Sequence, residues 1–277
     1  MSLNVLVAPP FGSNPDSPGT ASGSDCVHAG NQHDAWSTRI EIARSSGHPE
    51  DIEVLADEAP SPALRASARE LATETLRLRP LRKSPDKVFL FSGHMIDMPD
   101  RPEPRFPANK ESLAAARIGE ALDALGAGPG DFAIAQGAAG GDILFGEACL
   151  ARGVSLQLLL PLPEPEFIAA SVLPCVDGES WRARYLALRE RLMLAPRIMP
   201  DALGPPPRDS NGNSTDPFER CNRWLLYSTL AQGLDRLHFI CLWNGNGGDG
   251  AGGTAHMVKE VTRRTSRITW LDTRELW

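Results

Sequence analysis

The feature that most constrains the fold of this chain is a series of short apolar runs that alternate with segments of helical periodicity. The runs occupy residues 88–91, 132–135, 154–160, 237–243 and 268–271. Because nearly every position in them is apolar, we expect strands covered on both faces, which is typical of a parallel sheet between two layers of helices. Strands that alternate with helices indicate βαβ units, and right-handed crossovers make such a sheet doubly wound. The sequence therefore predicts an α/β protein with a doubly wound, mostly parallel sheet.

Helical periodicity fills the intervals between these runs. Between the first two runs, apolar residues recur on one helical face at Ala114, Ile118, Ala121 and Leu125. Residues 200–217 are rich in Pro, Gly and Asn and are predicted to form a long surface loop. The other predicted helices cover about residues 141–152, 181–192, 218–232 and 254–264.

Two segments precede the first apolar run. Residues 1–33 are rich in Gly, Ser, Pro, Asn and Asp. They are predicted to be a flexible leader, because they cannot bury enough apolar area to offset the entropy lost on ordering. Residues 34–85 are predicted to form a helical appendage, in which Ser61 caps a helix that begins at Pro62. Residues 86–277 are predicted to form the sheet domain.

Composition disfavours several classes of protein. The formal net charge of −7 argues against non-specific nucleic-acid binding, which needs a basic face. The five cysteines include no C-x-x-C pair, so neither a disulfide framework nor a zinc knuckle is predicted, and a reducing compartment fits. No signal peptide is visible, and no run approaches the roughly 18 apolar residues that span a bilayer. We therefore expect a cytoplasmic protein without a membrane span in this chain.

Several familiar catalytic and cofactor motifs are missing. The sequence has no P-loop, no G-x-S-x-G elbow, and no H-E-x-x-H or His/Asp cluster that would indicate a metal. It also lacks G-x-G-x-x-G, and no acidic residue ends the strand after its main glycine stretch, which disfavours ordinary NAD binding. The sequence therefore predicts neither a metal nor a bound cofactor.

Glycine-rich stretches follow three of the apolar runs, after Phe91, after Ala135 and after Trp243. In doubly wound sheets, ligands bind beyond the carboxyl ends of the strands. The three coincidences therefore indicate a ligand site at that edge of the sheet.

The stretch Gly137-Ala-Ala-Gly140-Gly141-Asp142 lies directly before a predicted helix. Its small residues let the backbone approach a ligand, and the free N–H groups and dipole of the helix start favour an anion. The alternative is a glycine turn in which Asp142 caps the helix. Glu147, further along the same helix, is a candidate catalytic residue, and a plain surface position is the alternative.

The loop that contains Gly252, Gly253 and Thr254 lies between the run at 237–243 and another predicted helix. Thr254 can cap this helix or bind a phosphate oxygen. His256 falls in the first helical turn and is a candidate to face the ligand or to act in catalysis, with a structural role as the alternative. A disordered connection is the alternative for the loop as a whole.

Ser92, Gly93 and His94 end the first apolar run with a polar step that is a natural place for a ligand contact. His94 is a candidate hydrogen-bond donor or acid/base residue. Arg105 can bind a phosphate through its guanidinium fork, and Asn244, at the end of a strand, is a candidate ligand contact. A turn with a solvated histidine and a surface arginine are the alternatives.

The order and placement of these motifs resemble the SLOG superfamily over about residues 86–273. The residues that carry the resemblance are Ser92-Gly93-His94, Gly140-Gly141-Asp142 with Glu147, Gly153, Leu160-Pro161, Leu242-Trp243-Asn244 and Gly252-Gly253-Thr254. SLOG comprises Rossmann-like domains related to the DNA-processing protein DprA and to LOG, the cytokinin-activating nucleotide hydrolase. It includes ligand-sensing domains of TRPM channels and of bacterial anti-phage proteins. The resemblance implies a Rossmann-like domain that holds a nucleotide, often an ADP-ribose-type signal, on two glycine loops.

LOG enzymes carry P-G-G-x-G-T-x-x-E, whose Glu acts with a separate Arg to cleave an N-glycosidic bond. Here Ala251 replaces the leading Pro, one glycine is missing, and Met257 occupies the position expected for the Glu. The resemblance therefore implies ligand binding more directly than LOG-type hydrolysis.

Three hypotheses follow. The first is a sensor domain that binds an ADP-ribose-like or cyclic nucleotide-like messenger in a signalling or anti-phage defence protein. The alternative is an enzyme, a nucleotide N-glycosidase or phosphoribohydrolase of LOG type, with acid/base chemistry from His94, Asp142, Glu147 or His256. A third is an interaction module whose glycine loops are only long turns. A homo-oligomer, and an effector domain beyond residue 277, stay open.

Overall fold

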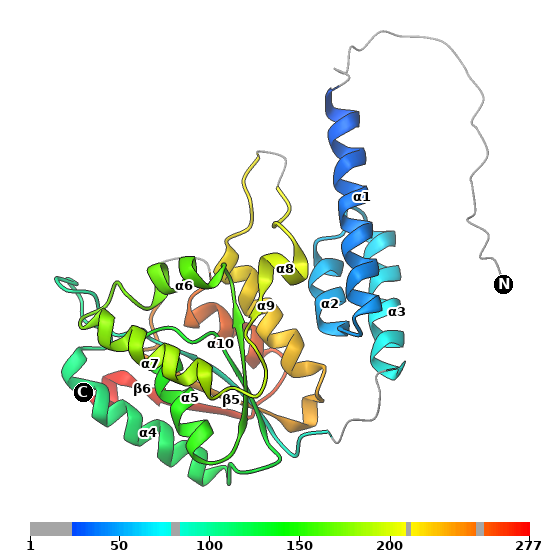
Figure 1. Cartoon of the computed structure of the whole chain (residues 1–277). Coiled ribbons are helices and arrows are strands. Elements are labelled where there is room, and N and C mark those ends of the chain that lie inside the picture. Colours follow the sequence, from blue (N-terminus) through cyan, green and yellow to red (C-terminus); the bar gives the residue numbers. More distant parts are fainter. Residues whose placement is uncertain (1–23, 79–83, 209–211, 248–251) are drawn as a thin grey trace, which may run out of the picture.

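The computed structural model describes residues 24–78, 84–208, 212–247 and 252–277, with side chains from residue 34 onward. These residues form one six-stranded parallel sheet with helices on both faces and three N-terminal helices beside it (Figure 1). The predicted α/β, doubly wound architecture is thus confirmed. None of the helices in the described ranges has the length together with the apolar character that a bilayer span requires.

The sheet has the strand order β4-β3-β2-β1-β5-β6. Its strands are β1 (Val88–Gly93), β2 (Phe132–Ala135), β3 (Ser155–Leu160), β4 (Arg197–Ile198), β5 (Leu237–Trp243) and β6 (Ile268–Asp272). The chain builds the sheet outward from β1 as far as β4 and then returns to place β5 on the other side of β1. The order of strands therefore reverses between β1 and β5, where the register aligns Val88 with Leu237 and Gly93 with Leu242. In open α/β sheets this reversal opens a crevice at the carboxyl edge.

Two layers of helices cover the sheet. One face packs against α4 (Glu111–Ala124), α5 (Gly141–Ala151), α6 (Glu164–Ser171) and α7 (Gly178–Glu190), and the other against α8 (Met199–Leu203), α9 (Pro217–Leu230) and α10 (Thr254–Thr262). Alternate strand residues serve the two cores: Phe89 and Phe91 of β1 lie in the first, and Val88 and Leu90 in the second. All four are buried, which explains the unbroken apolar run in the sequence.

Short elements complete the sheet domain. Two 3₁₀ turns, η1 (Ala108–Lys110) and η2 (Leu234–Arg236), precede α4 and β5, and α11 (Thr273–Leu276) follows β6. The sequence did not predict β4, which is too short to show a pattern, or α6. The predicted surface loop at 200–217 in fact begins inside α8, a five-residue helix with Pro200 in its first turn.

Three helices precede the sheet: α1 (Ser24–Ser45), α2 (Pro49–Asp57) and α3 (Pro62–Leu78). Helix α1 begins inside the segment predicted to be a flexible leader, and residues 1–23 lie outside the described residues. The hydroxyl of Ser61 accepts the N–H of Leu64 at 3.3 Å, so the predicted start of α3 is confirmed.

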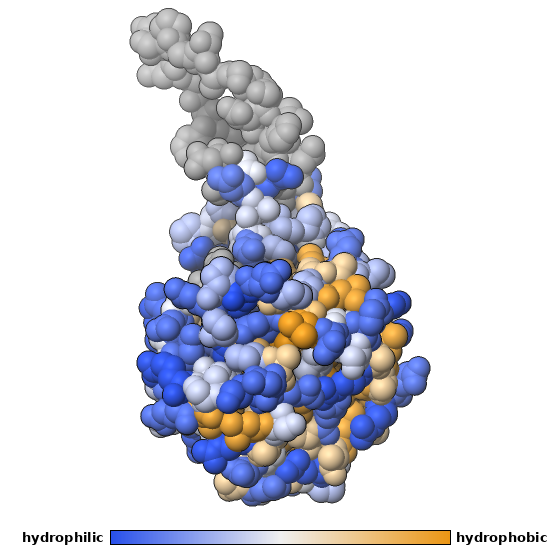
Figure 2. Space-filling model, turned by 90° about the vertical axis from the view of Figure 1, so that its left-hand side faces the viewer, coloured by the Kyte–Doolittle hydropathy of each residue, from blue (hydrophilic) through white to orange (hydrophobic). Residues whose placement is uncertain are grey.

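The N-terminal helices share a core with the sheet domain. Ile52 and Leu55 of α2 are buried in the same hydrophobic cluster as Trp224 of α9 and Leu90 of β1. In contrast to this buried apolar cluster, the face of the molecule shown in Figure 2 is largely hydrophilic, with apolar residues in several separate groups. Burial of apolar side chains between α2 and α9 therefore holds these helices against the sheet domain.

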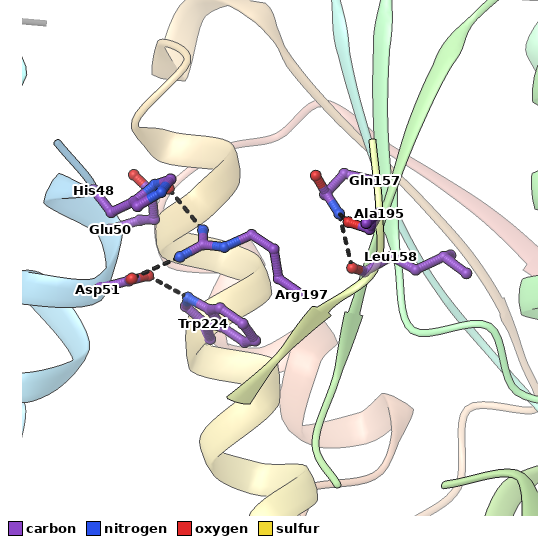
Figure 3. A network of polar contacts seen from close by, with 8 residues as sticks. All are labelled: His48, Glu50, Asp51, Gln157, Leu158, Ala195, Arg197 and Trp224. Carbon is purple, nitrogen blue, oxygen red and sulfur yellow. Dashed lines mark hydrogen bonds and ion pairs between the residues drawn. The ribbon is translucent and has the colours of Figure 1, made fainter. Parts of the chain in front are cut away.

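Buried polar contacts fix how α2 lies against α9 and β4 (Figure 3). The Arg197 guanidinium of β4 donates to Glu50 at 3.0 Å and to Asp51 at 2.6 Å. The indole N–H of Trp224 donates to the other carboxylate oxygen of Asp51 at 2.7 Å. Burial raises the pKa of Asp51, while the nearby Arg197 acts in the opposite direction. Since each buried charge needs its partners, this network ties residues far apart in the sequence to one arrangement.

Candidate functional site

A cavity of about 430 Å³ lies at the carboxyl edge of the sheet, where β1 and β5 end. Its walls come from the ends of these strands, the segment that follows β1, the loop after β2, the end of α6 with the segment after it, the first half of α9 and the loop before α10. Polar and aromatic residues of the lining include Ser92, His94, Arg101, Arg105, Gln136, Asp142, Phe218, Asn222, Trp243 and Thr254. This volume falls in the range of small-molecule sites, and its place at the strand reversal is the one that the fold favours for ligands.

Most of the predicted ligand-contact residues meet at this cavity. Those that line it are Ser92, Gly93, His94, Arg105, Asp142, Gly252, Gly253 and Thr254. Asn244 instead lines a neighbouring cavity of about 330 Å³, which Arg105 also lines. The two loops that the sequence indicated as ligand loops, near Asp142 and near Thr254, therefore face one space.

Gly137, Gly140 and Gly141 do not line the cavity, and their small size serves packing instead. Gly140 has a φ of 101°, and a Cβ there would lie 2.6 Å from the backbone nitrogen of Ile96. A Cβ on Gly141 would lie 3.1 Å from the ring of Phe91. The glycines thus let α5 start against the segment that follows β1.

Three N–H groups in the turn before α5 and at its first residue are occupied by the protein itself. Those of Gly137 and Ala138 donate to the Asp142 carboxylate at 3.0 and 3.3 Å. The N–H of Gly141 donates to the carbonyl of His94 at 3.1 Å. The prediction that this glycine stretch offers free N–H groups to an anion is therefore wrong for Gly137, Ala138 and Gly141, whose N–H groups are taken by the Asp142 carboxylate and the His94 carbonyl.

Asp142 is buried and lines the cavity. Burial raises the pKa of its carboxyl to about 6, although hydrogen bonds from the backbone N–H groups of Gly137, Ala138 and Gln136 act to lower it. A carboxyl group that titrates near neutral pH inside a cavity can exchange a proton with a bound ligand. Asp142 is thus a candidate for acid/base chemistry in this cavity.

Among the described residues, no side chain caps helix α10, which begins at the cavity. Gly253 occupies the N-cap position, and the Ser92 hydroxyl donates to the Thr254 hydroxyl at 3.3 Å. The start of α9, at the same cavity, is different, because the Asp216 side chain accepts the N–H groups of Phe218 and Glu219. The positive end of the α10 dipole, with two hydroxyl groups beside it, is therefore a place where the cavity can stabilise an anion.

Two amide side chains that sequence reasoning missed lie between these elements. Gln136, which directly follows β2, donates to the Asn222 side-chain carbonyl of α9 at 3.1 Å, and Asn222 donates to the carbonyl of Gly252 at 2.5 Å. Gly252 has a φ of 90°, and a Cβ there would lie 2.4 Å from the nitrogen of Glu219. The pair therefore joins β2, α9 and the loop before α10. The sequence signal that could have identified this part of the site is a polar residue, Gln136, directly after a buried strand.

The segment that follows β1 brings two arginines, Arg101 and Arg105, to the cavity. The Asp97 carboxylate accepts the backbone N–H groups of Arg105 and Phe106, each at 3.0 Å, and lies 3.5 Å from the Arg101 guanidinium. The Phe106 side chain is fully buried. The arginine-bearing loop is thus anchored at both ends, and Arg101 adds a cation that the sequence prediction did not include.

His94 joins the ends of the two central strands. Its backbone N–H donates to the carbonyl of Leu242 at 2.9 Å, and its Nε2 accepts the backbone N–H of Asn244 at 3.1 Å. A backbone N–H only donates, so Nε2 carries no proton in this arrangement and the neutral ring is protonated on Nδ1. His94 is buried and lines the cavity, which keeps it a candidate for ligand contact.

The other two candidate catalytic residues, Glu147 and His256, line neither of these two cavities. Glu147 accepts two hydrogen bonds from Arg184, at 2.9 and 2.5 Å, and Arg184 also pairs with Glu111 at 2.6 Å. His256, on α10, has a buried Nδ1 without a hydrogen-bond partner in the described part of the chain. Their placement favours a structural role for both.

Comparison with known proteins adds no family assignment to this geometry. We found no protein-family model that matches the chain and no curated protein that matches it significantly. What the protein does is therefore inferred from the chemistry of the cavity.

Proposed function

We propose that the cavity binds a phosphate-bearing, nucleotide-derived ligand, and that the chain is the ligand-sensing domain of a signalling or defence protein. The observation that carries the proposal is the meeting, at the strand reversal, of the start of α10 with Arg105 and Arg101. A helix start and guanidinium groups are the two protein features that most favour phosphate.

The phosphate is expected at the α10 end of the cavity. Thr254 begins this helix, and its hydroxyl and that of Ser92 can both donate to phosphate oxygens. The Arg105 guanidinium can form a bidentate contact, which a lysine cannot reproduce. Since the loop that carries Arg105 is held by Asp97, less entropy is lost when the ligand binds.

The rest of a nucleotide finds suitable chemistry in the same cavity. Phe218 and Leu225 contribute apolar surface that a base can cover. Gln136 and Asn222 present amide groups, each with donor and acceptor atoms that suit the edge of a base or the hydroxyls of a ribose. A site with apolar walls and a few converging polar groups is typical of small-molecule recognition.

The positions of Met257 and Glu147 in the structure support ligand binding over LOG-type hydrolysis. Met257, at the position expected for the catalytic Glu, is buried in the hydrophobic core of the second helical layer. Glu147 is held by Arg184. The site therefore lacks, among its described residues, a carboxylate in the place where LOG enzymes carry one.

Isothermal titration of the full chain with AMP, ADP, ADP-ribose and cyclic nucleotides tests the proposal. We expect at least one of them to bind, and Arg105→Gln to weaken that binding by about tenfold, because a charged hydrogen bond is lost. Arg263→Gln is the matched control, since Arg263 pairs with Glu260 on α10 and lines neither cavity. Absence of binding to the whole panel, or equal affinities for Arg105→Gln and the control, contradicts the proposal.

One observation favours a second candidate, a nucleotide N-glycosidase or phosphoribohydrolase. Asp142 is buried in the cavity with its pKa raised to about 6, which suits a general acid or base at neutral pH. Incubation with nucleoside monophosphates and NAD, followed by chromatography, separates this candidate from a sensor. Release of free base that Asp142→Asn abolishes supports the enzyme, and intact nucleotides after long incubation exclude it.

A further inference from the structure

The buried carboxyl group of Asp142 forms part of the wall of the cavity of about 430 Å³, to which we assign an anionic ligand. Backbone N–H groups, among them those of Gly137 and Ala138 at 3.0 and 3.3 Å, donate to it. Among the described residues, no basic side chain pairs with it. The Cys221 thiol of α9 also interacts with it, but burial raises the pKa of that thiol, which therefore stays neutral. When Asp142 is ionised, its negative charge is thus offset by backbone N–H groups alone.

Asp142 is connected to the end of the cavity where the phosphate is expected. The backbone N–H of Gln136 donates to the Asp142 carboxyl, and the Gln136 side chain donates to Asn222 at 3.1 Å. Asn222 in turn donates to the carbonyl of Gly252, in the loop that leads into α10, at 2.5 Å. Two residues therefore join the carboxyl group to the loop at the start of α10, and all of these groups border one cavity.

An anion that enters a cavity of this size lies close to the Asp142 carboxyl. Like charges repel more strongly in a buried site than in water, because the local dielectric constant is lower. The ionised form of Asp142 therefore weakens the binding of an anion, and a bound anion favours the protonated form. A protonated carboxyl still has acceptor atoms for the backbone N–H groups, so the turn before α5 can keep its shape in both forms.

From this geometry we propose that the ligand binds together with one proton, which Asp142 takes up from solvent as the anionic group enters the cavity. The inference rests on the proposed function and names the regulation of that same site, since the affinity for the ligand then rises as pH falls. Burial already raises the pKa of the Asp142 carboxyl to about 6. A modest further rise on ligand binding is therefore enough for the coupling to act near neutral pH.

The cavity is lined by other charged groups, which the test has to separate from Asp142. Arg101 and Arg105, from the segment after β1, keep their charge between pH 5 and pH 8. Asp216 accepts two backbone N–H groups at the start of α9. His94, at the end of β1, can gain a proton as pH falls, which would also favour an anion. A variant of Asp142 that leaves His94 in place therefore separates the two groups.

Titration of the full chain with ADP-ribose between pH 5 and pH 8 tests the inference. Each phosphate of this probe has one acidic oxygen, which is ionised throughout the range, so any proton taken up belongs to the protein. We expect the affinity of the wild type to fall about tenfold from pH 5 to pH 8, as follows if binding raises the pKa of Asp142 by about one unit. Calorimetry near pH 6.5, in buffers with different enthalpies of ionisation, should show uptake of about half a proton for each ligand bound.

Asp142→Asn is the discriminating variant, because its side chain is neutral at every pH and keeps an acceptor oxygen. It should bind ADP-ribose as the wild type does at pH 5, within about threefold, and about tenfold more tightly than the wild type at pH 8. A residue with a structural role alone would give weaker or equal binding at both pH values. Arg263→Gln, the control, should keep the pH dependence of the wild type, and thermal unfolding of each variant shows that the fold is intact.

The outcomes separate this inference from the proposed function. A wild-type affinity that does not change with pH, or binding without proton uptake, overturns the inference and leaves the cavity as a ligand site. An equal pH dependence in Asp142→Asn overturns it as well and assigns the proton to His94. Absence of ADP-ribose binding at every pH also overturns it, whereas binding of another nucleotide of the panel would still support the proposed function.

Discussion

The Oδ2 atom of Asp142 lies 3.0 Å from the backbone nitrogen of Gly137, inside the turn that joins β2 to α5. A carboxylate of the protein thus occupies the position that an anionic ligand takes in glycine loops of this kind. The two loops of the site therefore contribute different groups to the cavity. The first loop supplies a buried carboxyl group to the cavity, and the second leads into the start of α10.

The raised pKa of Asp142 predicts a specific dependence of stability on pH. The folded-state pKa of about 6 lies above the ordinary value of an aspartate, which is about 3.9, so the folded chain binds this proton more tightly than the unfolded chain. The contribution to stability is full below about pH 4 and is lost as pH rises through 6. The difference in unfolding free energy between the wild type and Asp142→Asn should therefore fall by about 2 kcal/mol between pH 4 and pH 7.

Urea unfolding of the two proteins at several pH values measures this difference. The asparagine variant keeps the size of the side chain and its acceptor oxygen, so only the titration is removed. A difference that stays constant over this range contradicts the assignment of the buried, titrating carboxyl to Asp142.

Gly252 is predicted to be needed for the shape of the loop before α10. Its φ of 90° is unfavourable for other residues, and an alanine Cβ would lie 2.4 Å from the Glu219 nitrogen. We expect Gly252→Ala to lower the unfolding free energy by about 1–3 kcal/mol. Gly128→Ala is the control, because Gly128 has no atom within 4 Å of its Cβ position and no positive φ. Equal stability of the two variants in urea would show that the loop tolerates a side chain.

Arg220 and Glu58 form a buried ion pair between α9 and the end of α2, with side chains that are 1% and 5% exposed. Replacement of Arg220 by Met leaves the Glu58 carboxylate buried without its partner, and we expect a loss of about 3–5 kcal/mol of unfolding free energy. The double variant Arg220→Met, Glu58→Leu should lose less. Arg117→Ala, which breaks the exposed pair with Glu120, should change stability by no more than about 0.5 kcal/mol.

A double-mutant cycle in urea measures this coupling. Independent, additive losses for the two substitutions would mean that the N-terminal helices are not held by this pair.

The hydrogen bond from the Asn244 N–H to Nε2 predicts the tautomer of His94. Nitrogen chemical shifts of a histidine-labelled sample should identify a ring with the proton on Nδ1 and a bare Nε2. A His94 signal typical of an Nε2-protonated ring would require a different contact between the ends of β1 and β5.

Much of the sheet could be predicted because most of its strands are apolar runs with polar or glycine-rich segments at their ends. The run 132–135 is β2, and the run 237–243 is β5, with the same end residues in sequence and structure. The two-residue β4 could not be found, because two positions show no period. Local apolar pattern thus predicts elements that are long enough to have one.

The site was predictable only in part, for a different reason. Ser92 and Thr254 lie at strand and helix ends that any doubly wound sheet brings to its carboxyl edge. Asn222 reaches the cavity because α9 crosses the sheet, and its contact with Gln136 joins residues 86 positions apart. The hydrogen bonds from Gly137 and Ala138 to the Asp142 carboxylate depend on the rotamer of Asp142, which no local sequence pattern specifies. A contact between residues far apart in the sequence, and a contact that depends on one rotamer, can be identified only once the three-dimensional structure is known.

A crystal structure of the full chain with ADP-ribose bound tests most directly where the phosphate groups lie. We predict phosphate oxygens within hydrogen-bonding distance of the Thr254 N–H and of the Arg105 guanidinium, with Asp142 still bonded to Gly137. Phosphates seated in the loop between Gly137 and Gly141 in place of the Asp142 carboxylate, or ligand bound away from the carboxyl edge of the sheet, would contradict this assignment.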